Sequence, residues 1–185
     1  METRERMVEA TARLIARQGY HATGVAQVLT ESEAPRGSLY FHFPEGKQQM
    51  ASAAIERLGQ ELGAVLQAKL DAKPDVKAGL QSIARMFARQ LEATDFQLGC
   101  PVATTALEAS SDSPALTAAC AQVFERWTEL LAGRLRQERP RIASPERVAR
   151  TVLALIEGAL VLARARRSTE SLRDAEQAIG VLLEG

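Results

Sequence analysis

Apolar residues recur every three or four positions along most of the chain, which is the period of an amphipathic α-helix. The clearest stretch places Val76, Leu80, Ile83, Phe87 and Leu91 on one helical face. The sequence contains no run of alternating apolar and polar residues of the kind that forms a half-buried strand. The pattern therefore predicts an all-α protein of about nine helices.

Glycine, proline and capping residues indicate where these helices begin and end. Gly19 is a plausible end for the first helix, and Asp75 a plausible cap for the helix that begins at Val76. Ser113-Pro114 and Ser144-Pro145 each place a capping hydroxyl before a proline at the first helical position. These signals predict helices at about 3–18, 45–72, 76–93, 101–108, 114–138 and 145–167, and a final helix capped by Ser168 or Thr169.

Three helices are expected within residues 1–50. Thr23 stands at a capping position before the apolar residues Val25 and Val28, and Pro35 suits the first turn of a third helix. We expect that third helix to run to about His42, with a tight turn between it and the second. This arrangement predicts a helix-turn-helix, the motif that places a short helix in the major groove of DNA.

Residues 34–43, APRGSLYFHF, combine groups that suit contact with DNA. Gly37 and Ser38 are small enough to let the backbone approach closely, and Arg36 can pair with a guanine edge or a phosphate. The hydroxyls of Ser38 and Tyr40 can donate to phosphate oxygens, and Lys47 is placed for a further contact. The aromatic residues fit a packing role as well. Residues 1–50 carry six positive and six negative side chains, so local charge does not decide between a DNA-contacting role and a packing role.

Overall composition restricts the function classes. Lys plus Arg and Asp plus Glu number 23 each, so net charge neither favours nor opposes a nucleic-acid partner. Two cysteines are too few for a disulfide framework, no signal-peptide pattern opens the chain, and the most apolar run, 151–163, is too short to cross a membrane. We therefore expect a cytoplasmic protein with no membrane partner. Metal-ligand spacings, phosphate loops and nucleophile motifs are missing from the sequence, so we expect no metal, no cofactor and no enzymatic activity.

The C-terminal part contains a set of residues that predicts a ligand-binding cavity. Cys120, Phe124 and Trp127 share one face of the helix expected at 114–138. A cavity lined by such groups with a few polar anchors suits a small, largely apolar or aromatic molecule. The same stripe also fits an ordinary helical core. The predicted lining consists of Phe87, Phe96, Cys100, Thr104, Leu107, Glu108, Cys120, Phe124 and Trp127.

Residues 6–50 closely resemble the DNA-binding domain of the tetracycline-repressor (TetR) family. The exit sequence FPEGK and the segment GCPVATTALE at 99–108 resemble the lincomycin-resistance-repressor branch of that family. Glu33 departs from the family pattern, which has glycine in the turn, and a left-handed backbone there costs a non-glycine residue on the order of 1 kcal/mol. The resemblance is carried by Gly19-Tyr20, Thr23, Gly37-Ser38-Leu39-Tyr40, Phe43 and Lys47.

The resemblance implies a helix-turn-helix DNA-binding domain at 1–46 and a helical ligand-binding and dimerisation domain at 47–185. It implies a ligand-responsive transcriptional repressor, released from a palindromic double-stranded DNA operator by a small-molecule inducer. It also implies a homodimer, paired through the last two long helices. The sequence supports pairing independently, because one short helix reads only a few base pairs and residues 151–163 are apolar nearly all round. The DNA contacts that the resemblance implies are Thr23, Gly24, Arg36, Gly37, Ser38, Tyr40, His42 and Lys47.

The alternative is a helical module that binds a small molecule or a protein and has no DNA function. In that case the N-terminal motif would serve only for packing. An enzyme would need a cluster of acid, base or nucleophile, which the sequence does not display.

Overall fold

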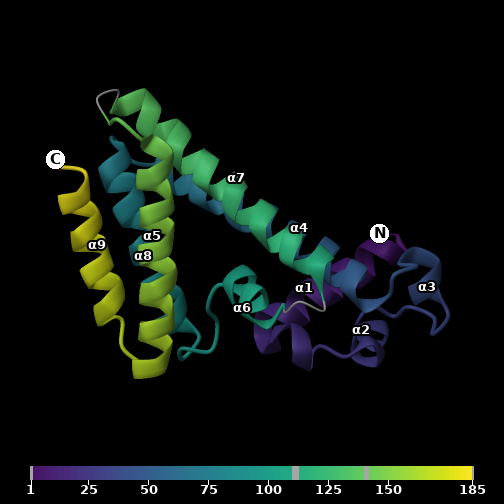
Figure 1. Cartoon of the computed structure of the whole chain (residues 1–185). Helices are drawn as coiled ribbons and strands as arrows, with labels where there is room; N and C mark the ends of the chain where they lie inside the picture. Colours follow the sequence, from purple (N-terminus) through teal and green to yellow (C-terminus); the bar gives the residue numbers. More distant parts are fainter. Residues whose placement is uncertain (1, 110–112, 140–141, 185) are drawn as a thin grey trace. The chain divides into compact units, whose positions relative to one another are not determined.

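The computed structural model of the protein describes residues 2–109, 113–139 and 142–184, which form helices joined by turns and short loops (Figure 1). The prediction of an all-α protein is confirmed for these residues. None of the helices within the described ranges has the length and continuous hydrophobicity needed to cross a lipid bilayer. The helices are α1 (Thr3–Ala22), α2 (Val25–Glu31), α3 (Ser38–His42), α4 (Lys47–Asp71), α5 (Val76–Ala93), α6 (Pro101–Glu108), α7 (Pro114–Glu138), α8 (Pro145–Arg166) and α9 (Glu170–Leu182).

The chain divides into two compact units. The first comprises Met1–Glu61 and Cys100–Phe124, and so contains α1, α2, α3, α6 and the N-terminal parts of α4 and α7. The second comprises Leu62–Gly99 and Glu125–Gly185, and so contains α5, α8, α9 and the remainder of α4 and α7. The functional boundary expected at residue 46 stays a prediction.

The core of the first unit is built on α1. Met7 and Leu14 are fully buried, as are Val28 of α2 and Phe43 at the end of α3. Helix α6 lies against α1 within the same unit (Figure 1). Two short helices and a segment from the middle of the chain are therefore organised around one N-terminal helix.

Helix α1 is broken at Gly19, where the sequence predicts its end. Gly19 has φ 82° and ψ 173°, a conformation that is essentially restricted to glycine, and the helix resumes as far as Ala22. The predicted cap at Thr23 is wrong, because Gly24 occupies the N-cap position of α2. The Thr23 hydroxyl instead donates back to the Gly19 carbonyl oxygen at 2.7 Å.

The second unit is a helical layer in which α5 packs against α8 and α9 (Figure 1). The predicted cap of α5 is confirmed, since Asp75 Oδ1 accepts a hydrogen bond from the Ala78 N–H at 2.8 Å. At the start of α9 the two predicted capping residues have different partners. The Ser168 hydroxyl accepts from the Glu170 N–H at 3.3 Å, while the Thr169 hydroxyl donates to Glu92 of α5 at 3.0 Å.

The turn between α2 and α3 contains the residue that departs from the family pattern. Glu33 has φ 51°, in the left-handed region that the resemblance predicts for this position. Arg6 of α1 supports the turn, with Nε donating to the Ser32 carbonyl oxygen at 2.9 Å. Helix α3 starts at Ser38 rather than at the predicted Pro35, because residues 35–37 complete this turn first.

Replacing Glu33 with glycine is expected to raise the free energy of unfolding by about 0.5–1 kcal/mol. Relief of the left-handed strain outweighs the extra freedom that glycine gives the unfolded chain. Urea denaturation followed by circular dichroism measures the difference. Ala34→Gly, at the next position and without a positive φ, is the matched control and should lower stability. A Glu33→Gly protein that is no more stable than the parent would contradict the strain argument.

Candidate DNA interface and predicted ligand-site residues

Helix α3 and its C-cap residue expose two aromatic side chains and bury two other apolar side chains. Tyr40 and Phe41 are 70% and 81% exposed, whereas Leu39 and Phe43 are 4% and 0% exposed. The buried pair anchors the helix, and the exposed pair is left on its outer face. Large exposed aromatic side chains on so small an element are typical of a surface that meets a partner.

The charge and the small residues of this segment are accessible from outside. Arg36 is exposed, and among the residues that the structure describes it has no ion-pair partner. A Cβ atom added at Gly37 would meet nothing within 4 Å, and the same holds for Gly24 at the start of α2. Ser38 is half-buried, and its hydroxyl donates to the Pro35 carbonyl oxygen at 2.6 Å. Backbone at two points of this surface can therefore approach another molecule closely.

Thr23 and His42 lie differently from the other predicted DNA contacts. Thr23 is only 2% exposed, and both its hydroxyl and its N–H donate to carbonyl oxygens of α1. His42 is half-buried and packs edge-on against Phe41, with the ring centroids 4.9 Å apart. Thr23 thus shapes the entry to α2 rather than facing outward.

Lys47, the predicted phosphate contact, lies across the end of α1. Its Nζ is 4.3 Å from the centroid of the Tyr20 ring and donates to the His21 carbonyl oxygen at 3.4 Å. Partial burial lowers the pKa of Lys47 below its ordinary value, and the nearby Glu108 carboxylate opposes this effect. The ammonium group is therefore held at one place beside the helix-turn-helix.

The nine residues predicted to line a ligand site do not all belong to one compact unit. Phe87, Phe96 and Trp127 lie in the second unit, and the other six lie in the first. Phe87 and Trp127 are buried, at 4% and 2% exposure, whereas Leu107 is 83% exposed. A common cavity for these residues stays a prediction. The six in the first unit are Cys100, Thr104, Leu107, Glu108, Cys120 and Phe124.

Some of these nine residues have interaction partners within the protein. The Thr104 hydroxyl donates to the Cys100 carbonyl oxygen at 3.1 Å, and the Arg167 guanidinium lies 5.6 Å from the Phe96 ring centroid. Cys100 and Cys120 are buried and are not joined in a disulfide, and burial raises the pKa of Cys120 to about 11.

Glu108 finds its partner on α1. Its Oε2 accepts hydrogen bonds from the backbone N–H groups of Tyr20, at 2.5 Å, and His21, at 3.1 Å. The sequence indicates that an inward carboxylate here needs a partner, but no local pattern points to a partner 88 residues away. Sequence reasoning missed this link, and it leaves open whether Phe41 faces outward, as the structure places it.

Two family models match separate parts of the chain. Residues 7–54 match the family of bacterial regulatory proteins called the tetR family, and residues 77–178 match the C-terminal domain of LmrA/YxaF-like transcriptional regulators. The chain is 31% identical to the HTH-type transcriptional regulator LmrA of Bacillus subtilis (strain 168), with 99% of this chain and 97% of LmrA covered.

Solved structures share the fold. The reduced form of Escherichia coli NemR is 22% identical, with a TM-score of 0.85 over 98% of this chain and 97% of NemR. A cysteine mutant of the TetR-family regulator CifR, complexed with a 26-bp operator duplex, is 20% identical, with a TM-score of 0.79 over 95% of this chain and 94% of CifR. The family matches at both ends of the chain and the nearly full-length similarity to LmrA lead to one conclusion: the chain belongs to the TetR family of transcriptional regulators.

Proposed function

We propose that the protein is a homodimeric repressor that binds a palindromic DNA operator through α3 and is released from it by a small apolar or aromatic inducer. The observation that carries the proposal is the division of α3 into a buried face, formed by Leu39 and Phe43, and an exposed aromatic face, formed by Tyr40 and Phe41. A helix that served only for packing would not leave its largest side chains in water.

Each residue of the interface has a chemical role in this proposal. The free charge of Arg36 suits a bidentate contact with a guanine edge, and the open surroundings of Gly24 and Gly37 let backbone N–H groups approach the phosphates. Tyr40 donates its hydroxyl to a phosphate, and Lys47 supplies a positive charge beside the groove. The remaining contacts, Ser38 and His42, are the first and last residues of α3, and Thr23 acts by positioning α2.

An apolar surface on the second unit supplies a dimer interface. Val161 and Leu162 of α8 are 57% and 55% exposed, and Val181 and Leu182 of α9 are 70% and 40% exposed. The two helices pack against each other, so these side chains belong to neighbouring elements. A Cβ atom added at Gly158 of α8 would meet nothing within 4 Å, which leaves room for a partner helix. We assign this surface to pairing with a second copy of the chain, which one short reading helix needs in order to bind tightly.

The inducer is proposed to act by non-covalent binding. Release requires that it bind more tightly to the form of the dimer whose reading helices do not match the operator spacing, since equal affinity for both forms shifts nothing. Cysteine chemistry is disfavoured as the signal, because Cys120 is 2% exposed and its pKa is raised to about 11 by burial.

Selection of binding sites from random DNA duplexes with the purified protein tests the proposed function. We expect a palindrome whose half-sites lie about one helical turn (roughly 34–36 Å) or a multiple apart. Absence of any enriched sequence would refute the regulator and favour a helical binding module without DNA function.

Replacing both Arg36 and Tyr40 with alanine is expected to weaken binding to the selected operator by about 100-fold or more, since each contact contributes roughly 1–3 kcal/mol. Fluorescence anisotropy measures the affinity, and circular dichroism and sedimentation should show an unchanged fold and dimer. Arg126→Ala, which removes an exposed arginine of α7, is the control and should bind as the parent does. Full operator affinity in the double variant would rule out α3 as the reading helix.

The double variant Val161→Asp/Val181→Asp is expected to be monomeric at micromolar concentration, because a buried carboxylate without a partner is strongly unfavourable at an interface. Sedimentation velocity measures the mass. Val65→Asp is the matched control, since Val65 of α4 is 41% exposed and lies outside the proposed surface. A double variant that remains dimeric would show that the dimer interface lies outside this surface of α8 and α9.

Alkylation of Cys120 is expected to be slow in the native protein. With a pKa of about 11, roughly one thiol in a thousand is ionised at pH 8, on the order of 100-fold less than for an unperturbed cysteine. The rate with iodoacetamide, measured by mass spectrometry, should rise about tenfold per pH unit between pH 8 and 10. Unfolded protein provides the fast reference. Rapid modification of native Cys120 at pH 8 would contradict the argument against cysteine modification as the inducing signal.

A further inference from the structure

The carboxylate of Glu108 caps a break in a helix that is distant in sequence. At Gly19 the backbone of α1 leaves helical geometry, so the N–H groups that follow behave like those of a new first turn, which need acceptors from outside the helix. Glu108 Oε2 accepts from the N–H groups of both Tyr20 and His21. The backbone oxygen of Glu108 is also 3.1 Å from His21 Nε2. One residue of α6 thus holds the last turn of α1 by three contacts.

The break has room for the carboxylate only because residue 19 is glycine. A Cβ atom added there would lie 2.3 Å from Glu108 Oε1, well inside van der Waals contact. The glycine therefore serves two purposes at once: it permits the unusual backbone angles and admits the acidic side chain of α6.

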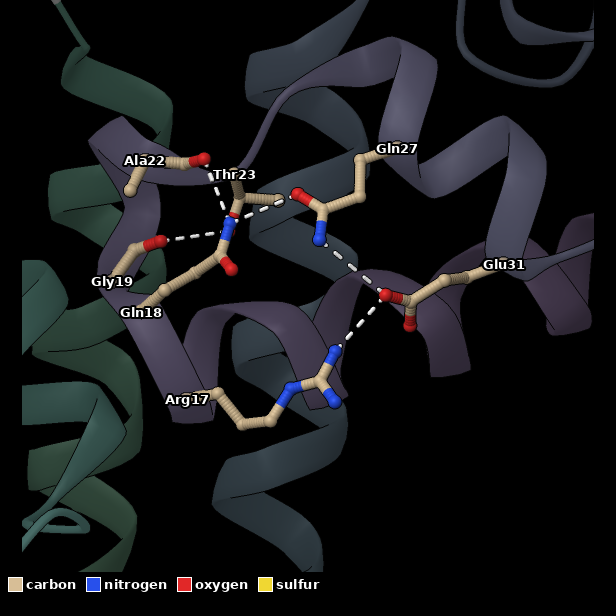
Figure 2. A network of polar contacts seen from close by, with 7 residues as sticks. All are labelled: Arg17, Gln18, Gly19, Ala22, Thr23, Gln27 and Glu31. Atoms are coloured by element: carbon tan, nitrogen blue, oxygen red, sulfur yellow. Dashed lines mark hydrogen bonds and ion pairs between the residues drawn. The ribbon is translucent and has the colours of Figure 1, made fainter.

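The turn that Glu108 holds is connected directly to α2 (Figure 2). Gln18 Nε2 donates to the Ala22 carbonyl oxygen at 2.7 Å and to the side-chain oxygen of Gln27 on α2 at 3.0 Å. The hydroxyl of Thr23, just before α2, donates to the carbonyl oxygen of Gly19. Residues on both sides of the break therefore determine where α2 begins.

A second connection joins the same two helices one turn further along (Figure 2). Arg17 pairs with Glu31 of α2 at 2.9 Å, and Gln27 Nε2 donates to the same Glu31 oxygen at 3.4 Å. Glu31 ends α2 and stands two residues before Glu33 in the turn that leads to α3. Contacts thus run without interruption from the broken end of α1 to both ends of α2.

We infer that Glu108 is a positioning residue for DNA recognition. It does not touch DNA; it sets the last turn of α1, and through that turn the placement of α2, of the α2–α3 turn and of Lys47, whose Nζ donates to the His21 carbonyl oxygen. The inference rests on the proposed DNA-binding function and adds a regulatory element to it. A displacement of α6 moves the acceptor away from the Tyr20 and His21 amides and so alters the geometry of the reading surface.

Two substitutions separate the hydrogen-bond acceptor from the charge. Glu108→Ala and Glu108→Gln both remove one negative charge, but glutamine keeps an oxygen that can accept from the α1 amides. Affinity is measured for the selected operator and for a scrambled duplex of equal length. Glu56→Ala, which removes an exposed glutamate of α4 within the same unit, is the control for charge loss alone.

Glu108→Ala is expected to weaken operator binding by about tenfold, the size of effect expected when a charge-assisted acceptor is lost. Affinity for the scrambled duplex should be unchanged or higher, because loss of a negative charge does not weaken attraction to phosphates. Glu108→Gln should recover at least half of the loss on a logarithmic scale. Hydrogen exchange at the Tyr20 and His21 amides should accelerate in Glu108→Ala and less so in Glu108→Gln.

Several outcomes would overturn the inference. Parental operator affinity in Glu108→Ala would do so, as would equal weakening of both duplexes together with a lowered melting temperature, which indicates a merely structural role. Glutamine performing no better than alanine would exclude the acceptor as the cause. Failure of the parent protein to select any operator contradicts the proposed function instead, and the exchange measurement, which needs no DNA, then decides alone whether Glu108 holds the turn.

Discussion

A helix of five residues is not stable by itself, so the orientation of α3 depends on what it buries. Leu39 and Phe43 attach it to the core in which Met7 of α1 is fully buried. The Ser38 hydroxyl lies 4.0 Å from Met7 Sδ, and the Arg4 guanidinium lies 5.2 Å from the Phe43 ring centroid. These contacts place α1 directly against α3 and its C-cap residue. The burial of Leu39 and Phe43 therefore determines where the exposed side chains of α3 lie.

Because α1 carries α3, whatever fixes α1 also affects the reading surface. Arg6 supports the turn at Ser32, and Glu108 holds the last turn beyond Gly19. The similarity to the tetR family's N-terminal domain ends at residue 54, yet Cys100–Phe124 packs in the same compact unit. The compact unit that contains α3 is thus larger than the segment that matches the tetR family, and it includes α6, which lies in the C-terminal half of the sequence.

Local features of the fold could be predicted from the sequence because short-range physics determines them. Asp75 caps α5 as expected, and the predicted bounds of α7 agree with the structure, because a capping residue or a proline marks each start. The predicted cap by the Ser144 hydroxyl is wrong, because Ser144 occupies the N-cap of α8 without a side-chain cap hydrogen bond. The Thr23 hydroxyl has two acceptable partners and bonds backward to Gly19 rather than forward into α2. A hydroxyl beside a helix break can bond either to the preceding helix or to the following one, and the residue type alone does not determine which.

The site could be predicted only where its geometry follows from neighbouring residues. The accessibility of Tyr40 follows from its place on a short helix, and that of Arg36 from its place in the turn before it. The periodicity of so short an element does not fix which ring faces inward, so the sequence does not decide the orientation of Phe41. The partner of Glu108 is 88 residues away in sequence, so only the packing of α6 on α1 reveals it.

A response to ligand requires an element with two arrangements of similar free energy, because packed cores do not deform gradually. The end of α1 has the properties that such an element needs. Gly19 has an unusual backbone conformation at the break in α1. The turn that follows is held by hydrogen bonds to Glu108 of α6 rather than to residues of the same turn. If α6 moves, the amides of Tyr20 and His21 lose a charged acceptor, and the free energy of the broken geometry rises relative to alternatives. In the proposed repressor, a movement of α6 would therefore alter the surface that α3 presents, because α6 supplies this cap from a distant part of the sequence.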